Sequence, residues 1–597
     1  MKPCSVALAL SLSLTLLPAA LGAQSRDLRR QIPATAWGYV QFEGMASARA
    51  AFDRMPESAP FKALMKTLKK KGLLAEMEDG LQMGMDQINE GIGQLGHSTA
   101  EFRALVSRPM VLVVGRPTLI SEGMMPSLLL MVDVAKAEKE AQSLLETLAM
   151  LSTTMGEAEL MELREPRMTV AHFAKGPGKI AWTIQDKVLY LSLGTGLLRD
   201  TLATSAGTKP ALTLPSLLAQ SEKSLGRKPE LSLYMDLHKV QDSLGWLMPY
   251  EVVELGRILG LEGVEGLYYG AAATEKGFFE VERLLIPGSK GGLAQRMLGK
   301  PTPCAAAELA EKDTLLFTSM QVDTRALTEA FQKILPLLPP QVQDRVERRI
   351  LGGSWQMEPI LGMDANALAD QFGGEWSFAL QAPRGSELIP EVLLFVPVQD
   401  SAKVLNMVQG LLQMAPEVTL RDQKVGEEHV YVISLPKHVR QQVPLTPAFT
   451  FKNGFMIWSI NARSLKNQAR HWPTPAESYA GTEAFRKLRR STQGAASLLF
   501  LHLQTGFARL YNNKALKGMA LAGINQENPG LDLNLDDLPT TEQLAPLFQD
   551  AAYSFLWDEH GPVTRTENSP VSYARILVYG ASFFDWFLEQ AAKNEIR

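Results

Sequence analysis

The chain repeats itself, and this internal repeat constrains its fold more than any other feature. Two segments, one after Gln31 and one after Cys304, run from small residues into a Thr, then into an apolar stretch of strand length and a helical stretch. Each helical stretch carries an Ala-Phe pair, Ala51-Phe52 in the first segment and Ala330-Phe331 in the second. Self-similarity at such a long period predicts that the chain contains a duplicated unit.

Later landmarks keep the same order in both halves. Residues 127–150 resemble residues 391–414, and in both an apolar run changes to apolar positions three and four apart, which predicts a buried strand followed by an amphipathic helix. Residues 181–193 resemble residues 448–460, where two β-rich runs flank a turn. The turn in the second copy is Asn453-Gly454, and this pair is a strong hairpin signal.

These patterns predict an α+β fold built as two tandem homologous lobes. A chain of 597 residues is too long for a single hydrophobic core to keep growing, so more than one core is expected. We expect the lobes to span residues 24–303 and 304–597, each with a mostly antiparallel sheet and helices packed on one face. The apolar helix predicted over residues 576–592 should then pack onto the second sheet.

The first 23 residues predict a secretory signal peptide. A single basic residue, Lys2, precedes an apolar run and a small-residue exit. We therefore expect an exported protein, periplasmic or extracellular. No later stretch offers about 18 uninterrupted apolar residues, so no transmembrane span is expected after cleavage. The chain has 60 basic and 64 acidic residues, a balance that does not favour nucleic acid as a partner.

Cys304 is the one cysteine left after removal of the first 23 residues. It cannot form an intrachain disulfide, so the fold must depend on its apolar cores even in an oxidising compartment. Beside a run of alanines, Cys304 is either a small buried residue or a free reactive thiol.

Asp236 and His238 form a candidate acid–base or metal-binding pair. If both lay on one strand, their side chains would point to the same face. The internal repeat weakens this interpretation, because the matching positions are His502 and Gln504. A polar pair at a strand end that simply satisfies its own hydrogen bonds is the alternative.

Asp532, Asn534 and Asp536 place oxygen ligands at alternate positions, as a calcium loop does. Asp537 stands where such a loop needs Gly, and Gln543 stands where it needs a bidentate Glu. The intervening leucines favour a short strand or a helix edge instead. No other motif indicates a cofactor.

Two segments have no counterpart in the other half, residues 116–127 and residues 512–543. The first contains the adjacent Met124 and Met125, and the second is polar and rich in turn-forming residues. Because loops carry function while shared elements form the core, functional surfaces are expected in these two segments.

The opening Ile32-Pro33-Ala34-Thr35-Ala36 is followed by a predicted strand and helix, and a predicted hairpin followed by a helix recurs along the chain. In these features the chain resembles secreted bacterial proteins of a family of unknown function, the domain of unknown function numbered 3352. The resemblance covers most of each half. It implies export and a shared fold, and it implies no activity, cofactor or catalytic residue.

The sequence therefore predicts a non-enzymatic envelope protein, a scaffold that binds a protein or an apolar ligand between or beside its lobes. One alternative is an exported hydrolase whose site is assembled from distant residues around Asp236 and His238. Another is a carrier of lipid or other apolar molecules.

Overall fold

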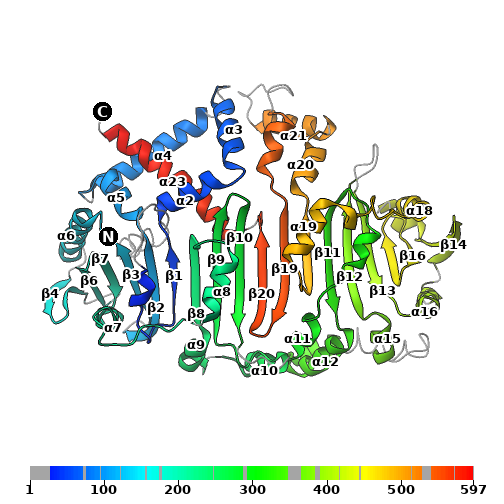
Figure 1. The fold of residues 1–597 in the computed structure, drawn as a ribbon, viewed down its shortest axis with the longest axis horizontal. Helices are drawn as coiled ribbons and strands as arrows, with labels where there is room; N and C mark the ends of the chain where they lie inside the picture. Colours follow the sequence, from blue (N-terminus) through cyan, green and yellow to red (C-terminus); the bar gives the residue numbers. More distant parts are fainter. Residues whose placement is uncertain are drawn as a thin grey trace.

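The computed structural model shows an α+β protein organised around one antiparallel sheet (Figure 1). The structure describes residues 27–595 apart from 71–74, 95, 121–122, 155–157, 174–177, 215, 246–247, 287–291, 347–364, 383–389, 414, 416, 443–444, 513, 528–538 and 571. The predicted α+β class is confirmed. Within this described part of the chain, no helix is both long and apolar enough to cross a membrane.

The first half of the chain contributes strands that pair antiparallel with their neighbours. Along the sheet their order is β4 (Glu159–Arg164), β5 (Arg167–His172), β6 (Lys179–Gln185), β7 (Val188–Leu193), β3 (Gly123–Asp133), β2 (Met110–Ile120), β1 (Gly38–Phe42), β8 (Leu231–Asp236), β9 (Gly266–Thr274) and β10 (Gly277–Leu285).

The second half repeats this pairing order. Its strands follow each other as β14 (Thr419–Val425), β15 (Glu428–Ser434), β16 (Ala448–Lys452), β17 (Phe455–Ser459), β13 (Glu391–Pro397), β12 (Gly374–Gln381), β11 (Thr314–Val322), β18 (Ser497–Leu501), β19 (Ala551–Asp558) and β20 (Gly561–Glu567). The duplication itself stays a prediction, and the repeated pairing order supports it.

The two halves meet edge to edge at a seam between β10 and β20. Residues 279–283 of β10 pair antiparallel with residues 563–567 of β20, so the sheet continues from one half into the other. The buried Arg283 guanidinium reaches across the seam to Asp558, with Nη2 2.8 Å from Oδ2. Hydrogen bonds and buried side chains therefore occupy this part of the junction between the two halves.

Helices cover both faces of the sheet, whereas one covered face per lobe was expected. On strand β3, Leu129 and Met131 point into a core that contains α7 (Gly196–Ser205) and α8 (Ser216–Ser224). Their neighbours Leu130 and Val132 point into the opposite core, which holds α2 (Met45–Arg54), α5 (Thr99–Val106) and α6 (Glu138–Thr154). A strand with apolar residues at successive positions must be buried on both faces, which accounts for this difference.

The second half is also covered on both faces. One core includes η3 (Ala305–Glu308), α18 (Ala462–Arg470) and α19 (Glu483–Ser491), and the other includes α15 (Ala365–Gln371) and α16 (Ser401–Gln413). Further helices lie beyond the ends of the strands: α3 (Ser58–Lys70), α4 (Ala75–Gln94), α20 (Leu503–Tyr511) and α21 (Lys514–Glu527) at one end, α9 (Leu237–Leu244) and α10 (Tyr250–Leu259) at the other (Figure 1).

The closing helix of each half packs against the opening helix of the other half. Helix α23 (Tyr573–Glu595) lies against α2, α4 and α5, and its Ala574, Val578, Ala581 and Leu588 belong to a core of the first half. Helix α11 (Leu293–Leu298) lies against α12 (Thr324–Ile334) of the second half. The expectation that the C-terminal helix packs onto the second sheet is therefore wrong, because an apolar helix face does not specify which apolar surface covers it.

Buried charges fix α23 in this position. The Asp585 carboxylate, 1% exposed, accepts hydrogen bonds from Arg103 Nε at 2.9 Å, Arg103 Nη2 at 3.0 Å and Arg49 Nη1 at 3.1 Å. Near the start of the helix, Arg575 Nη2 donates to the buried Glu57 carboxylate at 2.5 Å. Each of these bonds joins the last helix to the first quarter of the chain.

Candidate functional site

Helix α19 separates an apolar side from a basic side. Thr482 caps its first turn by accepting a hydrogen bond from the backbone N–H of Phe485 at 3.2 Å. Phe485 and Leu488 are buried against the sheet, and the Phe485 ring lies 5.1 Å from that of Tyr479. This packing directs the intervening cations of the segment away from the core.

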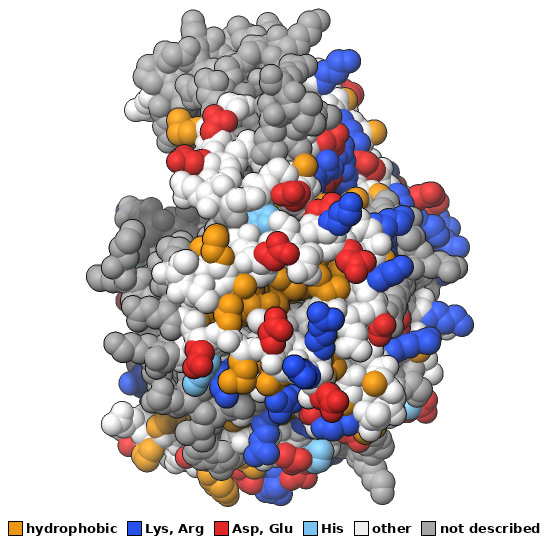
Figure 2. All heavy atoms as spheres, turned by 90° about the vertical axis from the view of Figure 1, so that its left-hand side faces the viewer, with side chains coloured by type: hydrophobic (Ala, Val, Ile, Leu, Met, Phe, Trp, Pro, Cys, Tyr) orange, Lys and Arg blue, Asp and Glu red, His pale blue; other side chains and the backbone are white. Residues whose placement is uncertain are grey.

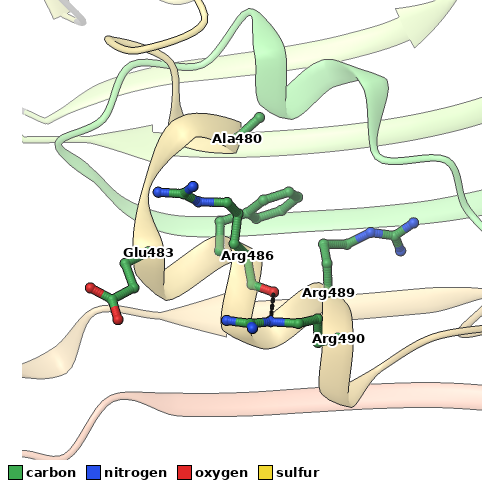
Figure 3. Close-up of a pocket in the computed structure, with 6 residues that line it drawn as sticks. Ala480, Glu483, Arg486, Arg489 and Arg490 are labelled. Carbon is green, nitrogen blue, oxygen red and sulfur yellow. Dashed lines mark hydrogen bonds between the residues drawn. The ribbon is translucent and has the colours of Figure 1, made fainter.

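The basic side of α19 borders an open depression of about 560 Å³. Its lining residues are Ala480, Glu483, Phe485, Arg486, Arg489 and Arg490 (Figure 3). A depression of this size is comparable with small-ligand sites, which typically enclose roughly 300–1,000 Å³.

Two exposed guanidinium groups of the depression, those of Arg486 and Arg490, keep hydrogen-bond donors that could reach an anion. Arg486 Nε donates to the Thr482 carbonyl at 3.4 Å, and Arg490 Nε donates to the Arg486 carbonyl at 3.3 Å (Figure 3). These bonds use only Nε, so the terminal nitrogens of both side chains stay available. Among the described residues, no carboxylate forms an ion pair with Arg486, Arg489 or Arg490.

The basic surface belongs to the second half alone. Helix α8 occupies the same place in the chain order of the first half, between α7 and β8, as α19 does between α18 and β18. Its sequence SLLAQSEKS contains one Lys and no Arg, whereas α19 reads EAFRKLRRS. A surface that one half has and the other lacks is not needed to form the shared fold.

The chemistry of the lining favours binding over catalysis. Arginine pairs carboxylates and phosphates through its planar fork and stays charged at all physiological pH values. Of the six lining residues, Glu483 is the sole carboxylate, and the set holds no His, Ser, Thr or Cys side chain. The depression therefore has groups to hold an anion and no arrangement of nucleophile and base.

The predicted pair Asp236 and His238 is not assembled into a site. Strand β8 ends at Asp236, which caps α9 by accepting from the backbone N–H of Lys239 at 3.0 Å. His238 lies on the helix with its side chain 70% exposed, 3.6 Å from Asp242. The assumption that both side chains share one face of a strand is wrong, because the chain turns into a helix between them.

Another His–Asp pair lies directly after β18 and directly before β19. His502 Nδ1 is 3.1 Å from Asp550 Oδ2, and the His502 ring packs edge-on against Phe500 and Tyr479. The His502 side chain is 13% exposed and is not one of the residues that line the depression. This pair therefore packs against aromatic rings of the second half and does not line the depression.

The calcium-like residues Asp532, Asn534 and Asp536 lie outside the described residues. Among the residues that the structure does describe, no group of three or more His, Cys, Asp or Glu side chains is placed to hold a metal ion.

Cys304 is a buried residue, as one of the two interpretations predicts. It is 4% exposed and adopts a left-handed backbone conformation with φ 59° before η3. Burial raises the pKa of the Cys304 thiol, so the reactive thiolate is disfavoured.

The two segments without a counterpart differ from the expected loops. Most of residues 116–127 belongs to the β2–β3 hairpin, in which Leu119 pairs with Met124 and Thr118 pairs with Met125. In the second segment, residues 514–527 form α21, whose Met519 is 73% exposed. Neither segment contributes to the depression on α19.

One end of the sheet presents apolar side chains. Figure 2 views the molecule from the β4 side and shows apolar groups gathered among charged ones. The exposed apolar residues of α6 and β4 are Met150, Leu160 and Met161. Strand β4 pairs with β5 along one edge, which makes this the terminal edge of the described sheet.

The arginines of α19 were not singled out from the sequence. The signal that could have identified them is the pattern of residues 483–491, in which apolar Phe485 and Leu488 alternate with four cations. Comparison with residues 216–224 would have shown that the arginines occur in one half only.

Comparisons with known proteins leave the family open. No family model matches the chain, and no curated protein matches it. A solved structure described as "Structure of crystal form III of TP0453" is similar over 46% of this chain and 87% of that chain, with 11% identity and a TM-score of 0.22. A likeness this weak carries no argument about function.

Proposed function

We propose that the protein is a non-enzymatic binding scaffold and that the depression over α19 receives an anionic group of its ligand. The observation that carries this proposal is the set of three arginines, Arg486, Arg489 and Arg490, that line one depression without a carboxylate partner among the described residues. Unpaired cations grouped on a helix repel one another, and an anion relieves this repulsion.

The proposed binding site lies beside the seam rather than between two lobes. The β10–β20 pairing and the Arg283–Asp558 bond occupy the junction of the two halves, which leaves the basic side of α19 as the better-supported location. The predicted signal peptide supports a location of this binding activity in the envelope or outside the cell. Membership of the family numbered 3352 is part of the same proposal and depends on the resemblance alone.

A pull-down from an envelope extract tests the proposal. The full chain and an R486Q/R490Q variant serve as bait at low and at high salt, with R199Q as the matched control because Arg199 is an exposed arginine on α7 of the other half. We expect partners or ligands that the wild type and R199Q retain at low salt, and that R486Q/R490Q loses. Recovery that is equal for all three baits, or unaffected by salt, would show that α19 is not the binding surface.

A further inference from the structure

We propose that the group bound over α19 is a phosphate monoester. This inference rests on the proposed function, because it specifies the chemistry of the anion that the same depression receives. It goes further by separating phosphate from the carboxylates that acidic protein surfaces present.

The spacing of the arginines matches an anion with several oxygens. Arg486 and Arg490 stand one helical turn apart, at positions i and i+4, and their side chains extend to the same side of α19, whereas the Arg489 side chain extends to the other side (Figure 3). A carboxylate has one charge and two oxygens, and a single guanidinium fork satisfies it. A phosphate monoester carries close to two charges near neutral pH and three terminal oxygens, so it can accept from more than one fork.

The backbone bonds of the arginines prepare them for this role. Because the Nε atoms of Arg486 and Arg490 are held by carbonyls one turn earlier, each side chain presents its two terminal nitrogens together. Such restriction lowers the entropy lost when the side chain binds an oxyanion. A lysine could supply the charge but not the paired donors.

The remaining lining residues indicate what the phosphate is attached to. Glu483 offers a carboxylate that accepts hydrogen bonds, and the half-buried Ala480 contributes apolar surface, whereas Phe485 is buried beneath the depression (Figure 3). A phosphate on a small polyol fits both features, since a hydroxyl can donate to Glu483. Soluble sugar or glycerol phosphates and a lipid headgroup with a terminal phosphate share this chemistry.

Titration of the full chain with glycerol 3-phosphate, and with succinate as a carboxylate dianion, tests the assignment by calorimetry. We expect glycerol 3-phosphate to bind more tightly than succinate, and R486Q or R490Q to weaken its binding by about tenfold, because each removes a charged hydrogen-bond donor. R486K should also weaken binding, since it keeps the charge and loses the fork. R199Q should bind like the wild type.

Vesicle flotation identifies the source of the phosphate. Binding to vesicles that contain phosphatidic acid, with none to phosphatidylglycerol vesicles of equal charge, would support a lipid phosphate monoester; binding of the soluble phosphate alone would support a soluble ligand. Equal affinity for succinate, or no binding of either phosphate probe, overturns the phosphate assignment. If the phosphate assignment fails but R486Q/R490Q still loses partners in the pull-down, the proposal of a binding scaffold stands. If R486Q/R490Q retains its partners as well, both proposals fail.

Discussion

Replacing Asp585 by Asn should release the C-terminal helix α23 from the first half of the protein. The Asp585 carboxylate is 1% exposed and accepts three hydrogen bonds from Arg49 and Arg103. The amide keeps the size of the side chain but removes its charge, and its NH2 group faces arginine donors instead of accepting from them. The substitution therefore breaks a buried ion pair without opening a large cavity.

The expected cost follows from the exposure of the partners. Removing one member of a fully buried pair costs about 3–5 kcal/mol, because the other charge stays buried and unpaired. Here Arg49 and Arg103 are 35% and 27% exposed, and Glu589 also lies within reach of both. Solvent and Glu589 will compensate in part, so we expect a loss of about 2–3 kcal/mol.

Hydrogen exchange of the α23 backbone measures this loss locally, which suits a chain of 597 residues that need not unfold in one step. A loss of 2–3 kcal/mol corresponds to exchange that is roughly 30- to 150-fold faster when α23 opens as a unit. The control is D370N, since the Asp370 pair with Arg325 lies at the surface, and it should leave α23 unchanged. Wild-type exchange rates in D585N would refute the idea that these charges hold the helix.

Three further predictions concern other parts of the fold. Burial raises the pKa of the Glu280 carboxyl in the folded protein. The contribution of this group to stability is therefore present below the ordinary pKa of Glu and is lost as pH rises through the folded-state pKa. E280Q should make this decline smaller, as melting midpoints measured between about pH 4 and 7 would show. The Cys304 thiol should resist alkylation in the native protein and react after denaturation, as peptide mapping would show; rapid native labelling would contradict its burial. At Gly561, φ is 118° and an added Cβ would lie 2.5 Å from the Leu284 carbonyl oxygen across the seam. G561A should therefore lower the free energy of unfolding by about 1–3 kcal/mol more than G454A, because Gly454 has open space around it. Equal losses of the two variants in denaturant titrations would argue against a tightly packed seam.

Local signals in the sequence predicted local structure well. The turn at Asn453-Gly454 has φ values of 48° and 78°. In the first half the turn lies at Asp186-Lys187, with φ values of 50° and 60°, one residue after the predicted Gln185-Asp186. Each connects the strands of a predicted hairpin, and the positive φ values explain why Asn, Asp and Gly occur there. Such turns depend on a few neighbouring residues, so one sequence is enough to recognise them.

The arrangement of elements over long distances was harder to predict. The β4–β5 and β14–β15 hairpins, which extend the sheet at its two ends, were missed because β4 is mostly exposed and shows little apolar alternation. The exchange of α11 and α23 between halves was missed for another reason. An amphipathic helix shows that one side is buried, but its sequence does not name the surface that covers it.

The candidate site falls between these two cases. The basic side of α19 can be read from residues 483–491, yet its lack of carboxylate partners depends on what the fold brings near it. The participation of Ala480 in the depression likewise depends on how the preceding turn sits beside the helix. Asp236 and His238 were misplaced because the change from strand to helix falls between them.

The position of α23 determines the order in which the protein can be completed during synthesis. The ribosome makes α2 and α5 long before α23, which completes their core, and Asp585 follows its partner Arg49 by 536 residues along the chain. Contacts of such long sequence separation form slowly, and the first half would expose apolar surface until α23 has been made. The core of the first half therefore cannot be completed by local folding, because its last helix comes from the far end of the second half.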